Sequence, residues 1–200
     1  MKAHARPGLL AWMVMSIATF PACWTYSLHP IAEENDPHLI YDPALEGTWQ
    51  VSDNQNEPLL IFTGDPKSLT YSLRLSETNA KDDAPDVRFD AKMVQLGANR
   101  FLDALPQGDA QGLGSLPAHN ILKVTLNHDS LALILASEDW LCNAPRLKLG
   151  ECTKGDFLLT APTDALQGFL QKYGSDNDLF PKPSDGDLFH RVQETRSKSN

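Results

Sequence analysis

Three cysteines are the residues whose types and spacing most directly suggest chemistry in this 200-residue chain. Cys142 and Cys152 enclose a nine-residue segment, NAPRLKLGE, and Cys23 lies far from both. The spacing does not favour a zinc site, because neither a Cys-x-x-Cys pair nor a pair of histidines accompanies these thiols. In an oxidising compartment the two later cysteines are suited to a disulfide, so a bond between Cys142 and Cys152 is predicted. Two unpaired buried thiols are the alternative.

The histidines and acidic residues do not converge on a catalytic site. Six histidines are scattered along the chain, at positions 4, 29, 38, 119, 128 and 190. His128 sits beside Asp129 in a predicted turn, which favours a solvated side chain over a metal ligand, and His119 precedes a predicted strand in a structural role. Asp90 and Asp103 fall in strand-like segments at positions that we expect to face solvent. General acid–base catalysis needs such groups in a cleft with a shifted pKa, so we expect that the protein is not an enzyme.

Motifs for nucleophilic catalysis, phosphate binding and calcium binding are missing from the sequence. There is no Gly-x-Ser-x-Gly nucleophile elbow, and the Gly-rich stretch QGDAQGLGSLPAH lacks the Lys and Ser/Thr of a P-loop. The segments SDNDLF and SDGD lack the frame of a calcium-binding loop. We therefore expect no cofactor and no metal.

The first 22 residues have the pattern of an export signal. Lys2 and Arg6 supply positive charge, and Gly8 to Phe20 is a run of 13 uncharged residues. A helix that spans a bilayer needs about 20 apolar residues, so this run is too short to remain in the membrane as a stable span. Residues 1–22 are therefore predicted to be a signal peptide that is removed.

The sequence Phe20-Pro21-Ala22-Cys23 resembles the lipobox of bacterial lipoproteins. The resemblance implies that the signal is cut before Cys23, that acyl chains are attached to its sulfur and its new amine, and that Cys23 is the lipidation site. Two acyl chains hold a protein at a bilayer stably, whereas one holds it only reversibly. A general secretory cut nearby, which would leave Cys23 as a free thiol, is the alternative.

The resemblance also implies a location and supports the disulfide. Because Trp24 follows the cysteine where an acidic retention signal would stand, it implies the outer membrane of the bacterial cell envelope, with the protein facing the periplasm. An odd number of cysteines in an exported chain leaves one unexplained. With Cys23 lipidated, Cys142 and Cys152 remain as a pair.

The rest of the chain is predicted to form a tether, one domain and a tail. Residues 23–44 contain prolines at 30, 37 and 43 and an acidic patch, which favours a semi-extended tether. Residues 45–176 are expected to form the folded domain, and residues 177–200 a polar tail. Removing residues 1–22, which carry two basic residues and no acidic one, changes the net charge from −9 to −11. Such an acidic chain repels phosphate backbones, so no nucleic-acid partner is expected.

Alternation of apolar and polar residues predicts a mainly β fold, an antiparallel meander that closes or nearly closes into a barrel. The clearest strand is SLTYSLRLSE, in which polar residues alternate with Leu69, Tyr71, Leu73 and Leu75. Other strands are expected near residues 46–53, 58–65, 87–94, 100–106, 121–126, 131–137 and 156–162.

One helix is expected after the last of these strands. In residues 163–174, apolar side chains recur at helical spacing and form a single stripe of Leu166, Phe169, Leu170 and Tyr173. Thr163 is the expected N-cap and Gly174 the expected C-cap. The stripe predicts that this C-terminal helix packs on the sheet.

The strands, the helix and Gly47-Thr48-Trp49 together resemble the lipocalin or calycin plan. This resemblance implies a barrel whose tryptophan plugs the closed end, an arginine that packs over the tryptophan, and a cup for a small apolar molecule. We match no arginine to that position from the sequence. More narrowly, a group of bacterial lipoproteins with no assigned activity is similar in four segments: VRFDAKMVQLGANRFLDALP, LPAHNILKV, LALILASEDWL and LLTAPTDALQGFLQKYGSD.

These observations lead to an expected function with one alternative. In a barrel of about eight strands, interior side chains either fill the centre or line a cup for one small ligand. The candidates for lining it are Trp49, Phe62, Tyr71, Phe89 and Phe101. We expect a lipid-anchored, non-catalytic binding module for a small apolar ligand or lipid, held at the membrane through its anchor. The alternative is a structural or assembly role through the outer surface, with no internal ligand; the sequence indicates no particular protein partner.

Overall fold

The computed structural model of the chain describes residues 24–51, 59–76, 87–108, 118–144, 148–152 and 156–192. The strands are β1 (Trp24–Ser27), β2 (Leu39–Ile40), β3 (Gly47–Gln50), β4 (Leu59–Asp65), β5 (Thr70–Ser76), β6 (Val87–Leu96), β7 (Asn99–Pro106), β8 (His119–Leu126), β9 (Ser130–Leu135), β10 (Gly150–Cys152), β11 (Asp156–Leu159) and β12 (Phe189–Arg191). The helices are η1 (Pro43–Leu45), α1 (Glu138–Cys142), α2 (Thr163–Tyr173) and η4 (Asp185–Asp187). The predicted signal peptide and Cys23 lie outside the described residues.

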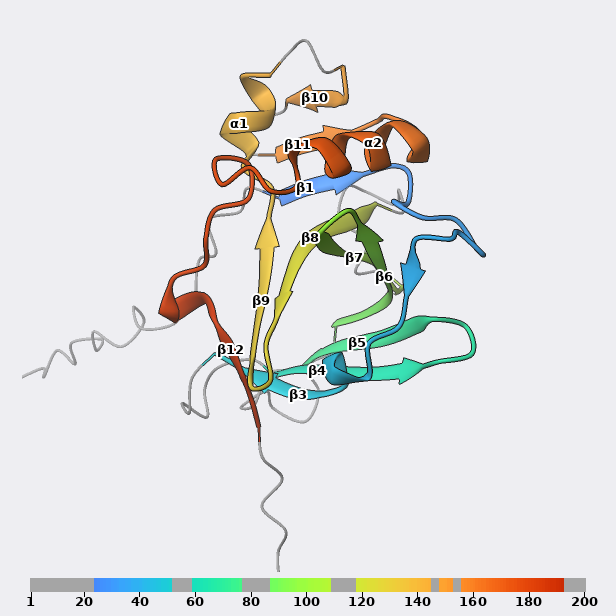
Figure 1. Ribbon diagram of the computed structural model, residues 1–200, viewed down its shortest axis with the longest axis vertical. Helices are drawn as coiled ribbons and strands as arrows, with labels where there is room; N and C mark the ends of the chain where they lie inside the picture. Colours follow the sequence, from blue (N-terminus) through green and yellow to red (C-terminus); the bar gives the residue numbers. More distant parts are fainter. Residues whose placement is uncertain are drawn as a thin grey trace, which may run out of the picture.

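Eight strands form a closed antiparallel barrel (Figure 1). Around the barrel they follow the order β3, β4, β5, β6, β7, β8, β9 and β12, and the ring closes because β12 pairs with both β9 and β3. The alternation that predicted β5 is seen in its burial, since Tyr71 and Leu73 are buried and Ser72 and Arg74 are exposed. The predicted mainly β fold, with an antiparallel meander closed into a barrel, is confirmed.

The direction of the strands gives the barrel two distinct ends. The short turns between β4 and β5, between β6 and β7 and between β8 and β9 lie at one end, which we call the base. The 3-10 helix η1 leads into β3 at this same end. At the opposite end, which we call the mouth, β3, β5 and β7 end and β4, β6 and β8 begin.

The predicted tether is wrong, because residues 24–44 are part of the folded domain. β1 pairs with β8 and, in parallel, with β11, while β2 pairs with β6. Ile31 and Ala32 have no solvent exposure. The prolines mark turns within a packed segment, and Pro43 occupies the start of η1, where its missing N–H has no helical partner to lose.

The predicted polar tail also contributes to the fold. Leu179 and Phe180 are buried, and β12, which lies in this region, is the last strand of the barrel. The strand expected at residues 156–162 appears as β11, but it pairs with β1 and β10 outside the barrel. The predicted helix, α2, therefore comes before the final barrel strand instead of after it.

Two apolar clusters share the strands of the barrel. One lies in the interior of the barrel, and the other lies between the outer face of the barrel and α2, β1 and β11. Figure 1 shows these three elements above the barrel. Leu166, Phe169 and Leu170 of the predicted helical stripe are buried in this outer cluster. Pro162 is the N-cap of α2, so the expected cap at Thr163 is wrong; the Thr163 hydroxyl instead donates to the carbonyl of Pro30 at 2.8 Å.

Candidate functional site

The base of the barrel is filled by side chains. Trp49, Phe62 and Tyr71, three of the residues predicted to line a pocket, are at most 2% exposed. They pack with other interior residues that include Leu45, Met93, Leu102 and Leu131. The indole N–H of Trp49 donates to the carbonyl of Leu45 in η1 at 2.9 Å. At this end the described aromatic side chains therefore act as packed core.

Arg191 on β12 covers Trp49 from the outside of the base. Its guanidinium carbon lies 4.2 Å from the centre of the Trp49 ring. Its two terminal nitrogens donate to the carbonyls of Glu46 and Ala44, each at 2.6 Å. Gly47 has φ +118°, and a Cβ there would lie 2.7 Å from the guanidinium. The arginine that the barrel resemblance implied is thus Arg191, which sequence reasoning missed because it placed this residue in a polar tail.

A polar network holds the segment before β3 against the base. The ring of Tyr41 stacks on that of Tyr71 with centroids 5.1 Å apart, and its hydroxyl donates to Glu46. The backbone N–H of Asp42 donates to the Tyr71 hydroxyl at 2.7 Å, and Arg100 pairs with the Asp42 carboxylate at 2.7 Å. The hydrogen bond to Glu46 raises the pKa of Tyr41 to about 12, and burial raises the pKa of Tyr71. Both hydroxyls stay protonated at neutral pH and serve as structural hydrogen-bonding groups.

Apolar side chains near the mouth face the interior but keep contact with solvent. Leu75 on β5, Phe89 on β6 and Leu122 on β8 pack against the interior cluster, and each is partly exposed. Trp49, by contrast, has no exposure. The interior is therefore fully buried around Trp49 and partly exposed at these three side chains near the mouth, of which Phe89 is one of the predicted lining residues.

Asn120 is a buried polar residue on the same side of β8 as Leu122. It is 4% exposed, and its amide nitrogen donates to the carbonyl of Ala104 on β7 at 3.3 Å. The next residue, Ile121, belongs to the outer cluster, so strand alternation directs Asn120 toward the barrel interior. Tyr26 on β1 pairs with Asn120 and continues this face of the sheet beyond the barrel.

Phe101, the fifth predicted lining residue, does not face the interior. It has no exposure and lies in the outer cluster, where its ring is 5.6 Å from that of Phe180. The prediction failed because β7 is covered on both sides: apolar residues alternate with residues that are also buried, so the pattern does not identify the inner face.

Asp103 is buried, so the expectation that it faces solvent is wrong. One carboxylate oxygen accepts the backbone N–H of Ile31 at 2.8 Å, and the other lies 2.6 Å from Nδ1 of His119. Asp103 and His119 thus form a structural pair that binds the segment around Ile31 to the outer face of the barrel. His128, in contrast, is exposed beside Asp129 in the turn between β8 and β9, as predicted.

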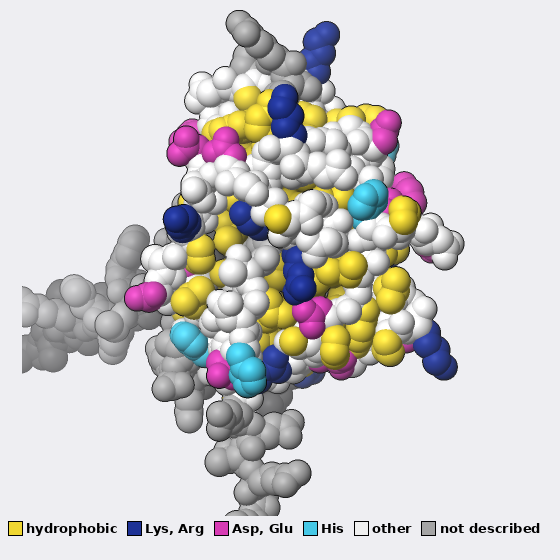
Figure 2. All heavy atoms as spheres, viewed as in Figure 1, with side chains coloured by type: hydrophobic (Ala, Val, Ile, Leu, Met, Phe, Trp, Pro, Cys, Tyr) yellow, Lys and Arg dark blue, Asp and Glu magenta, His cyan; other side chains and the backbone are white. Residues whose placement is uncertain are grey.

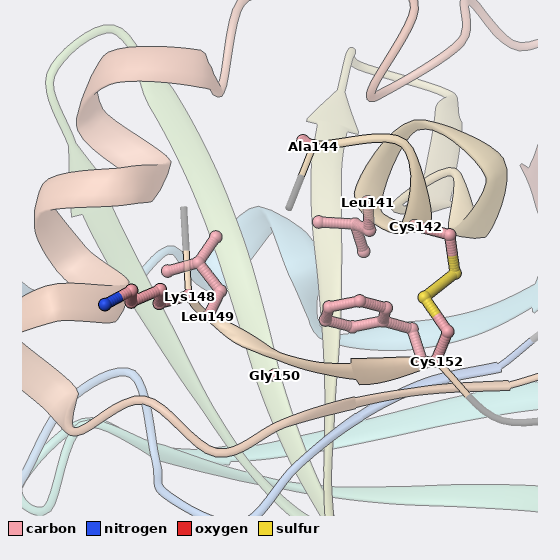
Figure 3. A pocket seen from close by; sticks show the side chains of 8 residues that line it. Leu141, Cys142, Ala144, Lys148, Leu149, Gly150 and Cys152 are labelled. Atoms are coloured by element: carbon pink, nitrogen blue, oxygen red, sulfur yellow. A yellow bond between two sulfur atoms is a disulfide. The ribbon is translucent and has the colours of Figure 1, made fainter. Parts of the chain in front are cut away.

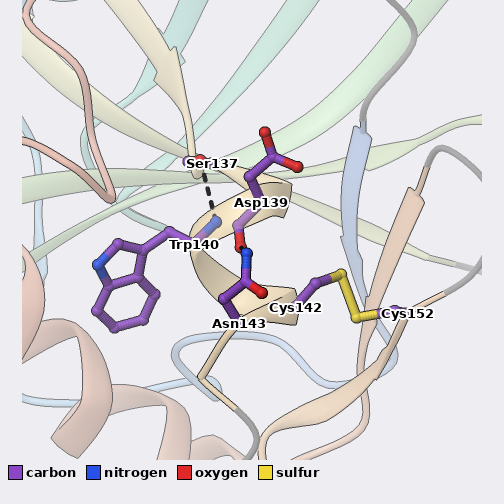
Figure 4. Close-up of a disulfide and its surroundings, with 6 residues drawn as sticks. All are labelled: Ser137, Asp139, Trp140, Cys142, Asn143 and Cys152. Atoms are coloured by element: carbon purple, nitrogen blue, oxygen red, sulfur yellow. Dashed lines mark hydrogen bonds between the residues drawn. A yellow bond between two sulfur atoms is a disulfide. The ribbon is translucent and has the colours of Figure 1, made fainter.

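Cys142 and Cys152 form a disulfide that joins α1 to β10, as predicted (Figure 4). Their Cα atoms are 5.8 Å apart. Ser137 caps α1 by accepting the backbone N–H of Trp140 at 3.3 Å.

Two cavities lie near this disulfide. One, of about 160 Å³, is lined by Leu141, Leu149 and Phe157 together with the disulfide (Figure 3). The side chain of Lys148 points away from the disulfide in this view. The other cavity, of about 450 Å³, is an open depression beside Trp140 and Asp178. Neither lies inside the barrel, so neither is the expected cup.

The described residues and the face seen in Figure 2 show how charged and metal-ligating side chains are distributed. Within the described ranges, histidine, cysteine and acidic residues form no cluster of three or more that suits a metal ion. On the face seen in Figure 2, acidic, basic and hydrophobic side chains are interspersed. A nucleic-acid site instead gathers lysine and arginine.

Comparisons with protein families, curated proteins and solved structures give no match to this chain. Among the described helices, none is long and apolar enough to cross a membrane. The argument for function therefore depends on the fold and the side chains described above.

Proposed function

We propose that this protein is a lipid-anchored, non-catalytic binding module of the bacterial cell envelope, which takes a small apolar ligand or the acyl chain of a lipid at the mouth of its barrel. The observation that carries the proposal is the partial exposure of inward-facing apolar side chains near the mouth. Trp49 at the base is fully buried, whereas Leu75, Phe89 and Leu122 near the mouth face inward and are partly exposed. When a ligand covers apolar side chains of this kind and removes them from water, the free energy of the system decreases.

The start of the fold supports the anchor at Cys23. Trp24, the next residue, is already in β1, and consecutive Cα atoms are only about 3.8 Å apart. Acyl chains on Cys23 would therefore be attached directly beside the sheet, without a tether. β1 pairs with the mouth end of β8 through Tyr26 and Asn120. The proposed anchor thus adjoins a strand that pairs with β8, which carries Leu122 of the proposed ligand site.

The second candidate is a structural or assembly role through the outer surface. The filled base favours it, as do the exposed side chains of Leu28 and Val192, the large hydrophobic residues that the described surface leaves most accessible. In this case a protein partner would cover these side chains, and the barrel would hold no ligand.

Displacement of a fluorescent fatty acid from the purified mature domain tests the proposed binding site. Phe89→Ser is expected to weaken binding because it removes an apolar side chain at the mouth. Asp90→Ser is the matched control, since its exposed side chain lies on the opposite face of the same strand. Binding that both variants retain at wild-type strength, or no binding by the wild type, would exclude the mouth as the site and favour the structural role.

The anchor has an independent test in cells. Cys23→Ser should abolish metabolic labelling with palmitate and leave the protein either uncleaved or released from the membrane. Labelling that persists in the variant would refute lipidation at Cys23.

A further inference from the structure

The buried amide of Asn120 has an oxygen without a hydrogen-bond partner. Its Oδ1 is buried and no donor among the described residues reaches it, whereas its Nδ2 donates to the carbonyl of Ala104 at 3.3 Å. This bond fixes the orientation of the amide, because only the nitrogen can donate to a carbonyl oxygen. The free acceptor is thus the oxygen.

An orphan acceptor of this kind is unusual in a folded protein. Buried polar side-chain atoms nearly always have a partner, and leaving one without a partner costs free energy. The other polar residues buried near the start of β1 have theirs: the hydroxyl of Thr25 donates to the carbonyl of Ala136 at 3.3 Å, and that of Ser27 to the carbonyl of His29 at 2.6 Å. Asn120 is therefore the exception in this part of the fold.

The surroundings of Asn120 are apolar and belong to the proposed site. Leu122 is two residues further along the same face of β8 and is partly exposed. Across the sheet, Asn120 pairs with Ala104 on β7, which pairs in turn with Ala91 on β6. Both of these paired residues are small. On the other side lies Tyr26 of β1.

We propose that the ligand at the mouth is an amphiphile whose apolar chain packs against the inward-facing residues and whose hydroxyl or N–H group donates to Oδ1 of Asn120. This inference rests on the proposed binding function and narrows its ligand class. A pure hydrocarbon fills the same apolar surface but leaves the amide oxygen unpaired. A lipid or alcohol with a donor near its chain satisfies both requirements, because a polar site rejects an analogue that lacks the matching group.

Two isomeric probes test this ligand class on the unaltered protein. 1-Decanol and nonyl methyl ether have the same atoms, but only the alcohol is a donor. The alcohol is expected to displace the fluorescent fatty acid with about three- to tenfold higher affinity, which is the range for one net hydrogen bond. Because the ether is the less polar isomer, apolar burial alone predicts the opposite preference.

Variants at position 120 then assign the preference to the amide. Asn120→Ala and Asn120→Leu should both remove the preference for the alcohol while retaining binding of the ether. Thr125→Ala is the matched control, because Thr125 lies on the same strand and is exposed. Circular dichroism and thermal unfolding establish that each variant is folded.

The outcomes separate this inference from the function on which it rests. A preference for the alcohol that disappears with Asn120→Ala supports the inference. Equal affinity for the two isomers, or a preference that survives both substitutions, overturns the inference and leaves the apolar site standing. If the alcohol, the ether and the fatty acid all fail to bind, the proposed function itself is overturned.

Discussion

Replacing Asp103 with alanine is expected to release the segment around Ile31 from the outer face of the barrel. The carboxylate of Asp103 is 4% exposed and accepts the backbone N–H of Ile31 at 2.8 Å. Its other oxygen pairs with His119 at 2.6 Å. The alanine variant removes both contacts and leaves a buried N–H without its acceptor.

The expected loss of stability follows from these two contacts. A buried polar group that loses its hydrogen-bond partner costs about 1–3 kcal/mol, and in this variant the backbone N–H of Ile31 and the His119 ring both lose theirs. Asp103 and His119 are both largely buried, with side-chain exposures of 4% and 17%. We therefore expect Asp103→Ala to lower the free energy of unfolding by about 2–6 kcal/mol.

Urea denaturation and amide hydrogen exchange measure the two consequences separately. Asp90→Ala is the matched control, because Asp90 lies on the neighbouring strand and is exposed, and its carboxylate accepts a hydrogen bond from Gln107. An exposed substitution of this kind should change stability by less than about 0.5 kcal/mol. In the Asp103 variant the Ile31 amide should exchange much faster than in the wild type, whereas in the control it should not change.

One result would refute this reasoning. If Asp103→Ala and Asp90→Ala unfold at the same urea concentration and the Ile31 amide stays protected, the segment before β2 is held by its other contacts, which include the hydrogen bonds of Thr163 to Pro30 and of Gln167 to Ile31. The buried pair would then have no measurable part in positioning it.

Three further predictions concern the disulfide, two glycines and a tyrosine. Replacing both Cys142 and Cys152 with serine should lower the free energy of unfolding by about 2–3 kcal/mol, since the bond spans a sequence separation of 10; denaturation of both forms measures it. Gly150→Ala should lower it by about 2 kcal/mol or more, because a Cβ would lie 1.9 Å from a backbone oxygen of β11. In α2, a Cβ at Gly168 would meet no atom within 4 Å, so Gly168→Ala should raise the free energy of unfolding by about 0.5–1 kcal/mol. A Gly150 variant that is more stable than the Gly168 variant would contradict this packing. Titration followed by tyrosinate absorbance should show a group with a pKa of about 12 that disappears in Tyr41→Phe.

The barrel was predictable from sequence because its strands are covered on only one side over much of their length. In β5 the residues Tyr71 and Leu73 alternate with Ser72 and Arg74, and the burial follows this alternation directly. A period of two identifies the inner face wherever the outer face is in water. The aromatic residues of the base, including Trp49, were placed correctly in the barrel interior for the same reason.

The wrong predictions for individual residues concern a strand whose outer face is covered by other elements. Asp103 and Phe101 both lie on the outer side of β7, and Ile31 and Phe180 come from distant segments to cover them. Alternation shows that two residues share a face, but it carries no information about what packs on that face. A charged residue in a strand was therefore assigned to solvent.

The contact of Arg191 with Trp49 could not be predicted from sequence for a different reason. This contact depends on a three-residue strand, β12, that joins two strands already formed by other parts of the chain. Such a strand is too short to carry a periodic signal of its own. The sequence did contain one indication that this segment is folded. Two Leu-Phe pairs, at residues 179–180 and 188–189, lie in an otherwise polar segment.

β1 connects the segment that was predicted to be a tether with the proposed ligand site. In β1 the small polar side chains of Thr25 and Ser27 are buried and the larger side chain of Tyr26 is partly exposed, which is the reverse of the pattern in a surface strand. The buried hydroxyls are satisfied by backbone carbonyls, and Tyr26 is thereby turned toward the face that carries Asn120. If Cys23 bears the lipid, strand pairing fixes the distance between the membrane anchor and the mouth, and no flexible linker intervenes. The proposed anchor would then hold the barrel directly at the membrane surface.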